Sequence, residues 1–189
     1  MRFKQLILTV ILMLFAFSFG IAQDTDASTK KTAYGLSVQV YPAGIIPTLN
    51  AEHYLSEKAS LLFRVGGNFT DRKDFSEEND NEKGAGFGGS FGYRKHYAVG
   101  KGEIIAGLNL DLWNLWIDWQ DGIGTANPTS GTTYTFVVQP WLETGYFFDL
   151  KNESKIGVTL GFGREINAIT NGEDVAQDFI GSISLQYYF

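Results

Sequence analysis

The stretch that most constrains the fold is the last nine residues, 181–189, because two kinds of side chain alternate along it. Apolar or small residues occupy every second position: Gly181, Ile183, Leu185, Tyr187 and Phe189. The residues between them are Ser182, Ser184, Gln186 and Tyr188. Successive side chains of a β-strand point to opposite faces, so this period of two predicts a strand with one apolar and one polar face.

Seven upstream segments show the same alternation, at about 33–41, 46–55, 61–69, 86–94, 104–112, 135–146 and 156–163, and the fifth of them can continue to 119. Each is close to the roughly 9–11 residues of a tilted membrane-spanning strand, and the total of eight is even. An aromatic content of 15% and 22 glycines favour a barrel over a soluble sandwich. The sequence therefore predicts an all-β fold, an eight-stranded up-and-down antiparallel transmembrane β-barrel over residues 32–189.

The predicted connections alternate in length. Those at 56–59, 98–102 and 149–154 are short turns, whereas those at 71–84, up to about 131, and at 167–175 are long loops. With both chain ends in the periplasm, the long loops fall outside the cell, and aromatic residues near the strand ends suit the two membrane interfaces. Pro140 falls inside the sixth segment and removes a ladder donor, which predicts a bulge there.

The first 22 residues read as a signal peptide. Arg2 and Lys4 precede an apolar run, and the small residues up to Ala22 suit cleavage after that residue. An uncleaved membrane helix is the alternative, but the run is short for one. Residues 23–31 are polar and are expected to form a periplasmic lead-in. The chain has no cysteine, which excludes a lipid-anchored lipoprotein, a disulfide framework and a thiolate metal site.

The closing pattern, with Phe189 last and aromatic or aliphatic residues at every second position before it, resembles the final strand of bacterial outer-membrane β-barrels. In that superfamily the motif serves as the insertion signal. The chain as a whole resembles the small eight-stranded barrels, such as the attachment/invasion type. The resemblance implies the outer membrane of a diderm bacterium as the location, and three partners: the barrel-assembly machinery, outer-membrane lipids and lipopolysaccharide.

Four charged residues are expected to face the lumen: Glu52, Arg64, Arg94 and Glu143. Glu52 and Arg64 flank the turn at 56–59 and can lie directly opposite each other. Their charges sum to zero, and an eight-stranded barrel has room inside only for side chains, so a structural plug is favoured over an ion path.

The loop at 71–84 carries six acidic residues: Asp71, Asp74, Glu77, Glu78, Asp80 and Glu82. They could bind calcium or bridge through it to lipopolysaccharide phosphates. Their spacing does not match an EF-hand, and a solvated external loop is the favoured interpretation.

Two further patterns argue against cofactor chemistry and catalysis. The run Gly84–Gly89 matches G-x-G-x-x-G, but a dinucleotide site needs a strand before it and a helix after it, and here a strand follows. His53 is expected to face outward near a periplasmic turn, and His96 to lie at the periplasmic rim within reach of Glu103. Neither assembles a triad with a serine and an acid at the outer face. We therefore expect no cofactor, no metal and no enzymatic activity.

Three functions remain open. The first is a structural or interaction role with a plugged lumen, acting through the outer loops or as a subunit of a larger outer-membrane complex. The second is a narrow channel for small solutes, and the third is a lipid-modifying enzyme. The net charge of −6, which becomes more negative once Arg2 and Lys4 are cleaved off, disfavours nucleic acid as a partner.

Overall fold

The computed structural model describes residues 32–73, 78–151 and 154–189. The predicted signal peptide and lead-in lie outside these residues. The strands are β1 (Thr32–Tyr41), β2 (Gly44–Ser56), β3 (Ala59–Lys73), β4 (Asn81–Val99), β5 (Gly102–Asp121), β6 (Thr129–Asp149), β7 (Lys155–Arg164), β8 (Ile166–Asn171) and β9 (Phe179–Tyr188).

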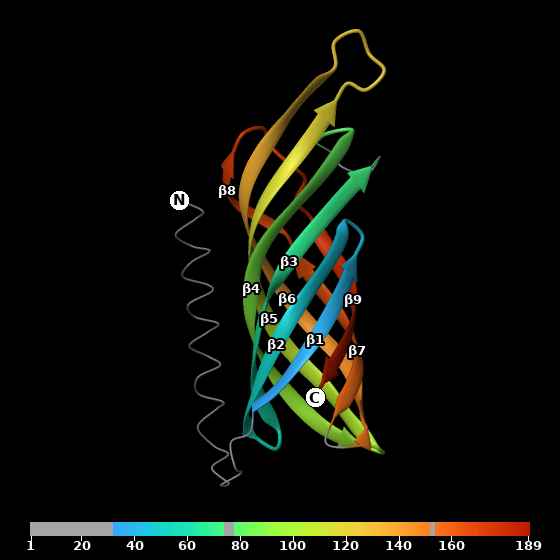
Figure 1. The fold of residues 1–189 in the computed structure, drawn as a ribbon. Coiled ribbons are helices and arrows are strands. Elements are labelled where there is room, and N and C mark those ends of the chain that lie inside the picture. The colour runs from blue at the N-terminus through green and yellow to red at the C-terminus, as the bar shows by residue number, and fades with distance from the viewer. Residues whose placement is uncertain (1–31, 74–77, 152–153) are drawn as a thin grey trace.

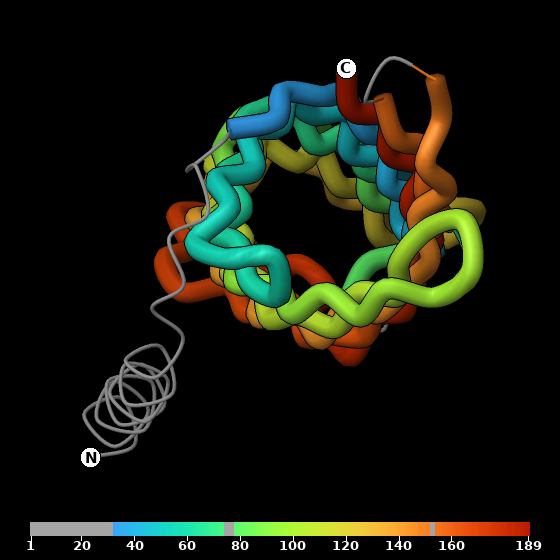
Figure 2. The backbone as a smooth tube through the Cα atoms, turned by 90° about the horizontal axis from the view of Figure 1, so that it is seen from below, coloured from blue at the N-terminus to red at the C-terminus, as the bar shows by residue number. Residues whose placement is uncertain are grey.

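The strands close into one antiparallel ring. Neighbours along the chain pair from β1 to β6, β6 pairs with β7, and β9 pairs with both β7 and β1. Strands β7 and β8 follow each other along β6 with only Glu165 between them, so they occupy one position in the ring. The barrel therefore has the eight strand positions that the alternation predicts, and Figure 2 shows the closed ring along its axis.

The alternation of side chains sets the two faces of the wall. Along β1, Leu36, Val38 and Val40 are exposed, whereas Ser37 and Gln39 are buried inside. Along β4, the outward positions between Lys83 and Lys95 hold only Ala85, Phe87, Gly89, Phe91 and Tyr93. An apolar outer surface of this height, with polar residues inside, is the pattern of a barrel that crosses a bilayer.

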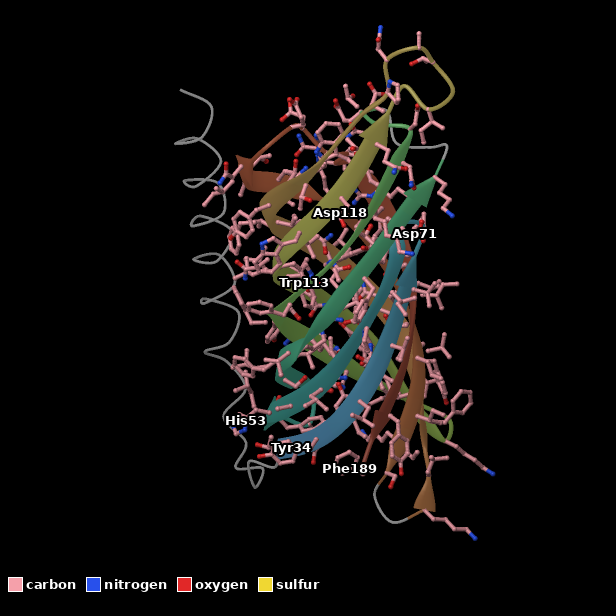
Figure 3. All side chains as sticks on the ribbon, turned by 45° about the horizontal axis from the view of Figure 1, so that its top comes forward. Tyr34, His53, Asp71, Trp113, Asp118 and Phe189 are labelled. Carbon is pink, nitrogen blue, oxygen red and sulfur yellow. The ribbon has the colours of Figure 1, made fainter. Side chains whose placement is uncertain are left out.

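The two ends of the barrel differ. The turn end carries the short connections that follow β2, β4 and β6, together with Tyr34, His53 and Phe189 (Figure 3). At the loop end, β4, β5 and β6 rise well beyond the β1–β2 hairpin (Figure 1). Asp71 and Asp118 lie toward this end.

The loop-end connections are shorter than the sequence predicts. Strand β3 runs to Lys73 and β4 begins at Asn81, so half of the expected loop at 71–84 is paired strand, with Asp71 opposite Lys83. The second expected loop, up to 131, begins only after Asp121 and ends before Thr129. The expected loop at 167–175 is also wrong in part, because β8 pairs with β6 from Tyr134 to Val138.

Pro140 interrupts strand pairing instead of inserting a residue. Trp141 of β6 pairs with Gly163 of β7, and Val138 pairs with Ile166 of β8, so the register is the same on both sides of the gap. Proline lacks the N–H that a ladder needs. On the other side of the strand the ladder with β9 continues past this gap, because the backbone N–H of Glu165 donates to the carbonyl of Asp178 at 2.8 Å. At Pro140 itself the pairing therefore breaks between β7 and β8, and a register shift in the β6–β8 ladder lies nearby, between Phe136 and Val137.

Within residues 32–73, 78–151 and 154–189, no helix has the length and apolar character needed to cross a membrane.

Candidate functional site

The lumen is crossed near the turn end by the side chain of Arg94, which projects from β4 and is fully buried. Its guanidinium donates to both carboxylate oxygens of Glu143, at 2.9 and 3.0 Å, and to Glu52 at 3.0 Å. It also donates to Gln186 at 2.9 Å and to the hydroxyl of Tyr188 at 3.0 Å. One arginine therefore ties β4 to β2, β6 and β9 across the interior. Charge-assisted bonds of this bidentate kind are the strong ones.

Arg64 forms a second bridge, and its partner differs from the predicted one. In the β2–β3 ladder Arg64 lies opposite Asn50, two residues from Glu52. Its guanidinium pairs with Asp111 of β5 at 2.7 Å and donates to Gln39 and Ser90 at 2.9 and 2.6 Å. The expected pairing of Glu52 with Arg64 is thus wrong, because the side chains reach across the lumen rather than along the hairpin.

The alternation along the fifth segment places Asp111 inside the barrel, but nothing in the sequence marks it as a partner of Arg64. Its second oxygen accepts the indole N–H of Trp141 at 3.1 Å, so one carboxylate holds both a cation and an aromatic ring. Trp141 is buried inside the barrel, as its position in the alternation predicts. The alternation gives the face of Asp111 but does not give its partner.

A third arginine, Arg72, organises the loop end. Its guanidinium pairs with Glu82 at 2.9 Å and with Glu165 at 2.5 Å. Gln139 donates to the other oxygen of Glu165 at 3.1 Å. The sequence assigned Glu82 to a solvated acidic loop, and this is wrong: Glu82 is fully buried, because it is an inward residue of β4.

The connection at 172–178 folds into the mouth of the barrel and is held there by this third cluster. Arg72 donates to the carbonyl of Ala176 at 2.9 Å, and the N–H of Ala176 donates to Glu82 at 3.1 Å. Asn79 bridges Glu82 and the carbonyl of Asp174, at 2.9 and 3.1 Å. Arg72 and Glu82, both buried, therefore form hydrogen bonds with backbone groups of the connection at 172–178.

Apolar side chains fill the lumen below this segment. They come from five strands, from the β1–β2 turn and from the covering connection: Tyr41, Ala43, Ile46, Trp113, Leu115, Ile117, Val137, Trp141, Val175 and Ile180. Between Arg64 and Glu143 lies a cavity of about 10 Å³, roughly the space of one water molecule.

The remaining described residues of the predicted acidic loop lie in different surroundings. Asp71 faces Lys83 at 3.6 Å on the outer surface, and Asp80 accepts the backbone N–H of Ile123 at 2.7 Å. Glu78 is exposed. Asp74 and Glu77 lie outside the described residues. Across the described part of the chain, no three histidine or acidic side chains are grouped as a metal ion would need.

The two histidines occupy different environments. His53 faces the outer side near the turn end, where its Nδ1 lies 2.9 Å from the hydroxyl of Thr32. His96 is buried inside, with Nδ1 3.3 Å from Glu103, as expected, and Nε2 2.8 Å from the hydroxyl of Ser60.

Ser60, His96 and Glu103 have the composition of a catalytic triad but not its hydrogen-bond order. The hydroxyl of Ser60 donates to Glu52 at 2.5 Å, so it accepts from His96 instead of giving up its proton to it. Ser60 is also fully buried. A nucleophile needs a base that takes its proton and a path for the substrate. This cluster is therefore a structural contact between β3, β4 and β5.

The glycines of the G-x-G-x-x-G match lie within β4, and β4 continues as a strand to Val99. A Cβ on Gly88 would overlap the carbonyl oxygen of Leu112 and lie 2.7 Å from the ring of Trp113, and one on Gly92, which lies beyond the match on the same strand, would overlap the side chain of Asn109. These glycines make room for larger inward side chains of β5. This agrees with the interpretation of the motif as a strand.

The predicted insertion signal lies on β9, which closes the ring between β7 and β1. Its outward side chains are exposed on the apolar surface: Ile183, Leu185, Tyr187 and Phe189. The N–H of Phe189 donates to the carbonyl of Tyr34 at 3.0 Å, so the terminal residue still bonds to β1.

No protein family matches the chain, and no curated protein matches its sequence. Among solved structures, the chain is similar to Neisserial surface protein A, with 12% identity over 83% of this chain and 92% of that one, at a TM-score of 0.49. The N-terminal β-barrel domain of Pseudomonas aeruginosa OprF is 9% identical over 84% and 96%, at 0.45. The outer membrane protein AlkL is 11% identical over 88% and 96%, at 0.44.

The fold follows from the strand pairing of this chain itself, and these similarities carry no information on activity. A closed antiparallel ring with a polar interior and an apolar outer belt is the form in which bacterial single-chain barrels cross the outer membrane. The chain is an eight-stranded transmembrane β-barrel.

Proposed function

We propose that the protein has a structural or interaction role in the outer membrane and acts through the part of the barrel that rises beyond the apolar belt. The observation that carries the proposal is the Arg94 network. Its guanidinium and the carboxylates of Glu52 and Glu143 span the lumen between opposite strands. A conducting pore would need these groups to separate, which would leave buried charges without partners.

The loop end offers the surface for such a role. The β5–β6 hairpin extends to Asp121 and Thr129, and its tip carries Ile123 with 57% of its surface exposed. The bond from the N–H of Ile123 to Asp80 ties this tip to the β3–β4 connection. A projecting hairpin that is held in place can present an apolar side chain to a partner without a large ordering cost.

The partners that suit this surface are outer-membrane lipids, lipopolysaccharide or a protein of a larger outer-membrane complex. The barrel-assembly machinery is proposed to act earlier, on the strand that ends at Phe189. The alternative function is a narrow channel for small solutes, and transport measurements separate it from the proposed role. A lipid-modifying activity would require a nucleophile and a base open to lipid, whereas Ser60 and His96 are buried.

Because the chain has no cysteine, single-cysteine variants test the proposal cleanly. Ile123→Cys at the hairpin tip should react with a membrane-impermeant maleimide on intact cells and should yield a defined cross-linked species with a bifunctional reagent. Leu150→Cys, at an exposed position of a turn-end connection, is the matched control and should react only after the outer membrane is permeabilised.

The reverse labelling pattern would invert the barrel and remove the proposed surface. Correct labelling without any cross-linked species, combined with solute flux through the purified protein, would instead favour the channel.

A further inference from the structure

The outer wall carries a groove of about 700 Å³ where the apolar belt meets the first charged residues of the loop end. The register of four strands places its lining in two rows. Phe69, Ala85 and Trp116 lie side by side on β3, β4 and β5, and Ile45 of β2 extends this row. One step closer to the loop end, Asp71, Lys83 and Asp118 form the second row.

The depression exists because Ala85 is small. Its neighbours Phe69 and Trp116 are bulky and exposed, at 48% and 46%, and they stand on either side of it as walls. Trp116 is held in position by Phe87, with ring centroids 5.8 Å apart, and by Tyr134 at 5.4 Å. The hydroxyl of Tyr134 donates to Asn114 at 2.9 Å, which fixes that ring in turn. The aromatic wall is therefore built before anything binds.

The second row contains both negative and positive side chains. Lys83 lies 3.6 Å from Asp71 and stands opposite Asp118 in the ladder, and Asp118 accepts from the hydroxyl of Thr132 at 2.6 Å. Carboxylates only accept hydrogen bonds and an ammonium only donates them. One positive and two negative groups give a net charge of −1, which disfavours an anionic phosphate as the main ligand. The row suits a group with many hydroxyls, which donate and accept at once.

We propose that this groove binds the headgroup of a lipid whose polar part is a neutral sugar. The position selects a lipid, because the apolar row faces the hydrocarbon and the charged row faces the headgroup level of the bilayer. The sugar ring would pack its C–H face on Trp116, while its hydroxyls bond to Asp71, Lys83 and Asp118. The acyl chains would follow the belt past Ile45 and Phe69. This inference does not depend on whether the barrel conducts or has a protein partner.

The test uses quenching of tryptophan fluorescence by brominated lipids, because Trp116 forms a wall of the groove. The full chain is refolded into phosphatidylcholine vesicles that contain brominated versions of one of two probes, diglucosyl diacylglycerol or phosphatidylglycerol. The sugar lipid should bind about threefold to tenfold more tightly than phosphatidylcholine, the factor that one hydrogen bond supplies. Phosphatidylglycerol should show no such preference.

Two variants locate the site. Ala85→Leu fills the groove from an exposed position and should abolish the preference, whereas the same substitution at Ala106, an exposed outward residue elsewhere on the belt, should keep it. Asp118→Asn keeps the shape and should reduce the preference. Equal quenching by both probes, preference for phosphatidylglycerol, or an unchanged preference in a folded Ala85→Leu barrel would each overturn the proposal.

Discussion

Three buried arginines connect strands across the lumen of this barrel. Each forms an ion pair with at least one buried carboxylate from another strand. Arg94 meets Glu52 and Glu143, Arg64 meets Asp111, and Arg72 meets Glu82. A buried pair contributes little compared with an apolar pair of the same shape, but breaking one is costly because the remaining charge loses its partner. The lumen is therefore sensitive to single substitutions.

Arg94→Met should destabilise the barrel by about 3–5 kcal/mol, because Glu52 and Glu143 would stay buried without their cation. Urea unfolding in lipid vesicles, followed by tryptophan fluorescence, measures the change. Arg164→Met is the matched control: Arg164 is exposed and its guanidinium lies 5.0 Å above the ring of Phe179, so its loss should cost about 1 kcal/mol or less. Similar losses in both variants would refute the central role of Arg94.

A double-mutant cycle distinguishes the observed partner of Arg64 from the one that the sequence suggests. Arg64→Met should cost a few kcal/mol, and adding Asp111→Asn should recover part of the loss, which gives a coupling energy of about 1–3 kcal/mol. Adding Glu52→Gln to Arg64→Met should give losses closer to additive. The unfolding free energies of the three single and two double variants show whether Arg64 is coupled to Asp111 or to Glu52. A larger coupling with Glu52 than with Asp111 would show that the hairpin pairing is correct.

At this scale the sequence predicts which way a side chain points but not what it touches. The period of two places Glu52, Arg64, Arg94 and Glu143 inside, and the structure confirms that all four are buried. The partners depend on how far the tilted strands are staggered around the ring. Asp111 lies 47 positions from Arg64 and Glu165 lies 93 from Arg72. Local alternation carries no information on such distances.

At the scale of the element, β9 closes the ring by pairing with β1 and carries the predicted insertion signal. Phe189→Ser should reduce the protein in the outer membrane and leave it degraded in the periplasm, if the terminal aromatic belongs to the insertion signal. Phe179→Ser changes an equally exposed aromatic, 58% against 66%, at the opposite end of the same strand and serves as the control. Immunoblots of fractionated cells measure both. Normal outer-membrane levels of the Phe189→Ser variant would exclude the signal.

The sequence predicts the strands inside the belt and misses their extensions beyond it. All eight segments are strands, with the expected faces. Residues 71–84 were expected to be a loop because they are charged. In the structure Asp71 and Lys83 are exposed outward residues beyond the apolar belt, while Arg72 and Glu82 are inward and pair with each other. A strand that is polar on both faces shows no alternation of apolar and polar residues. The sequence pattern therefore cannot reveal these strand extensions.

At the scale of the whole molecule, the interior is layered. The Arg94 network lies near the turn end, the Arg64–Asp111 pair follows, and apolar side chains fill the part below the connection at 172–178. Eight strands enclose a space that side chains can fill. We propose that these three groups of side chains close the lumen, while the outer face remains free to match the bilayer.

Electrical recording of the native protein in planar bilayers tests this closure most directly. The protein, refolded and inserted at a density confirmed by cross-linking or blotting, should show no stable ion-conducting steps over a range of voltages. A known porin reconstituted in the same way provides the positive control. Steady, ion-selective steps from the native chain that are altered by Arg94→Met or Arg64→Met would contradict the account. The protein would then be a channel through this same lumen.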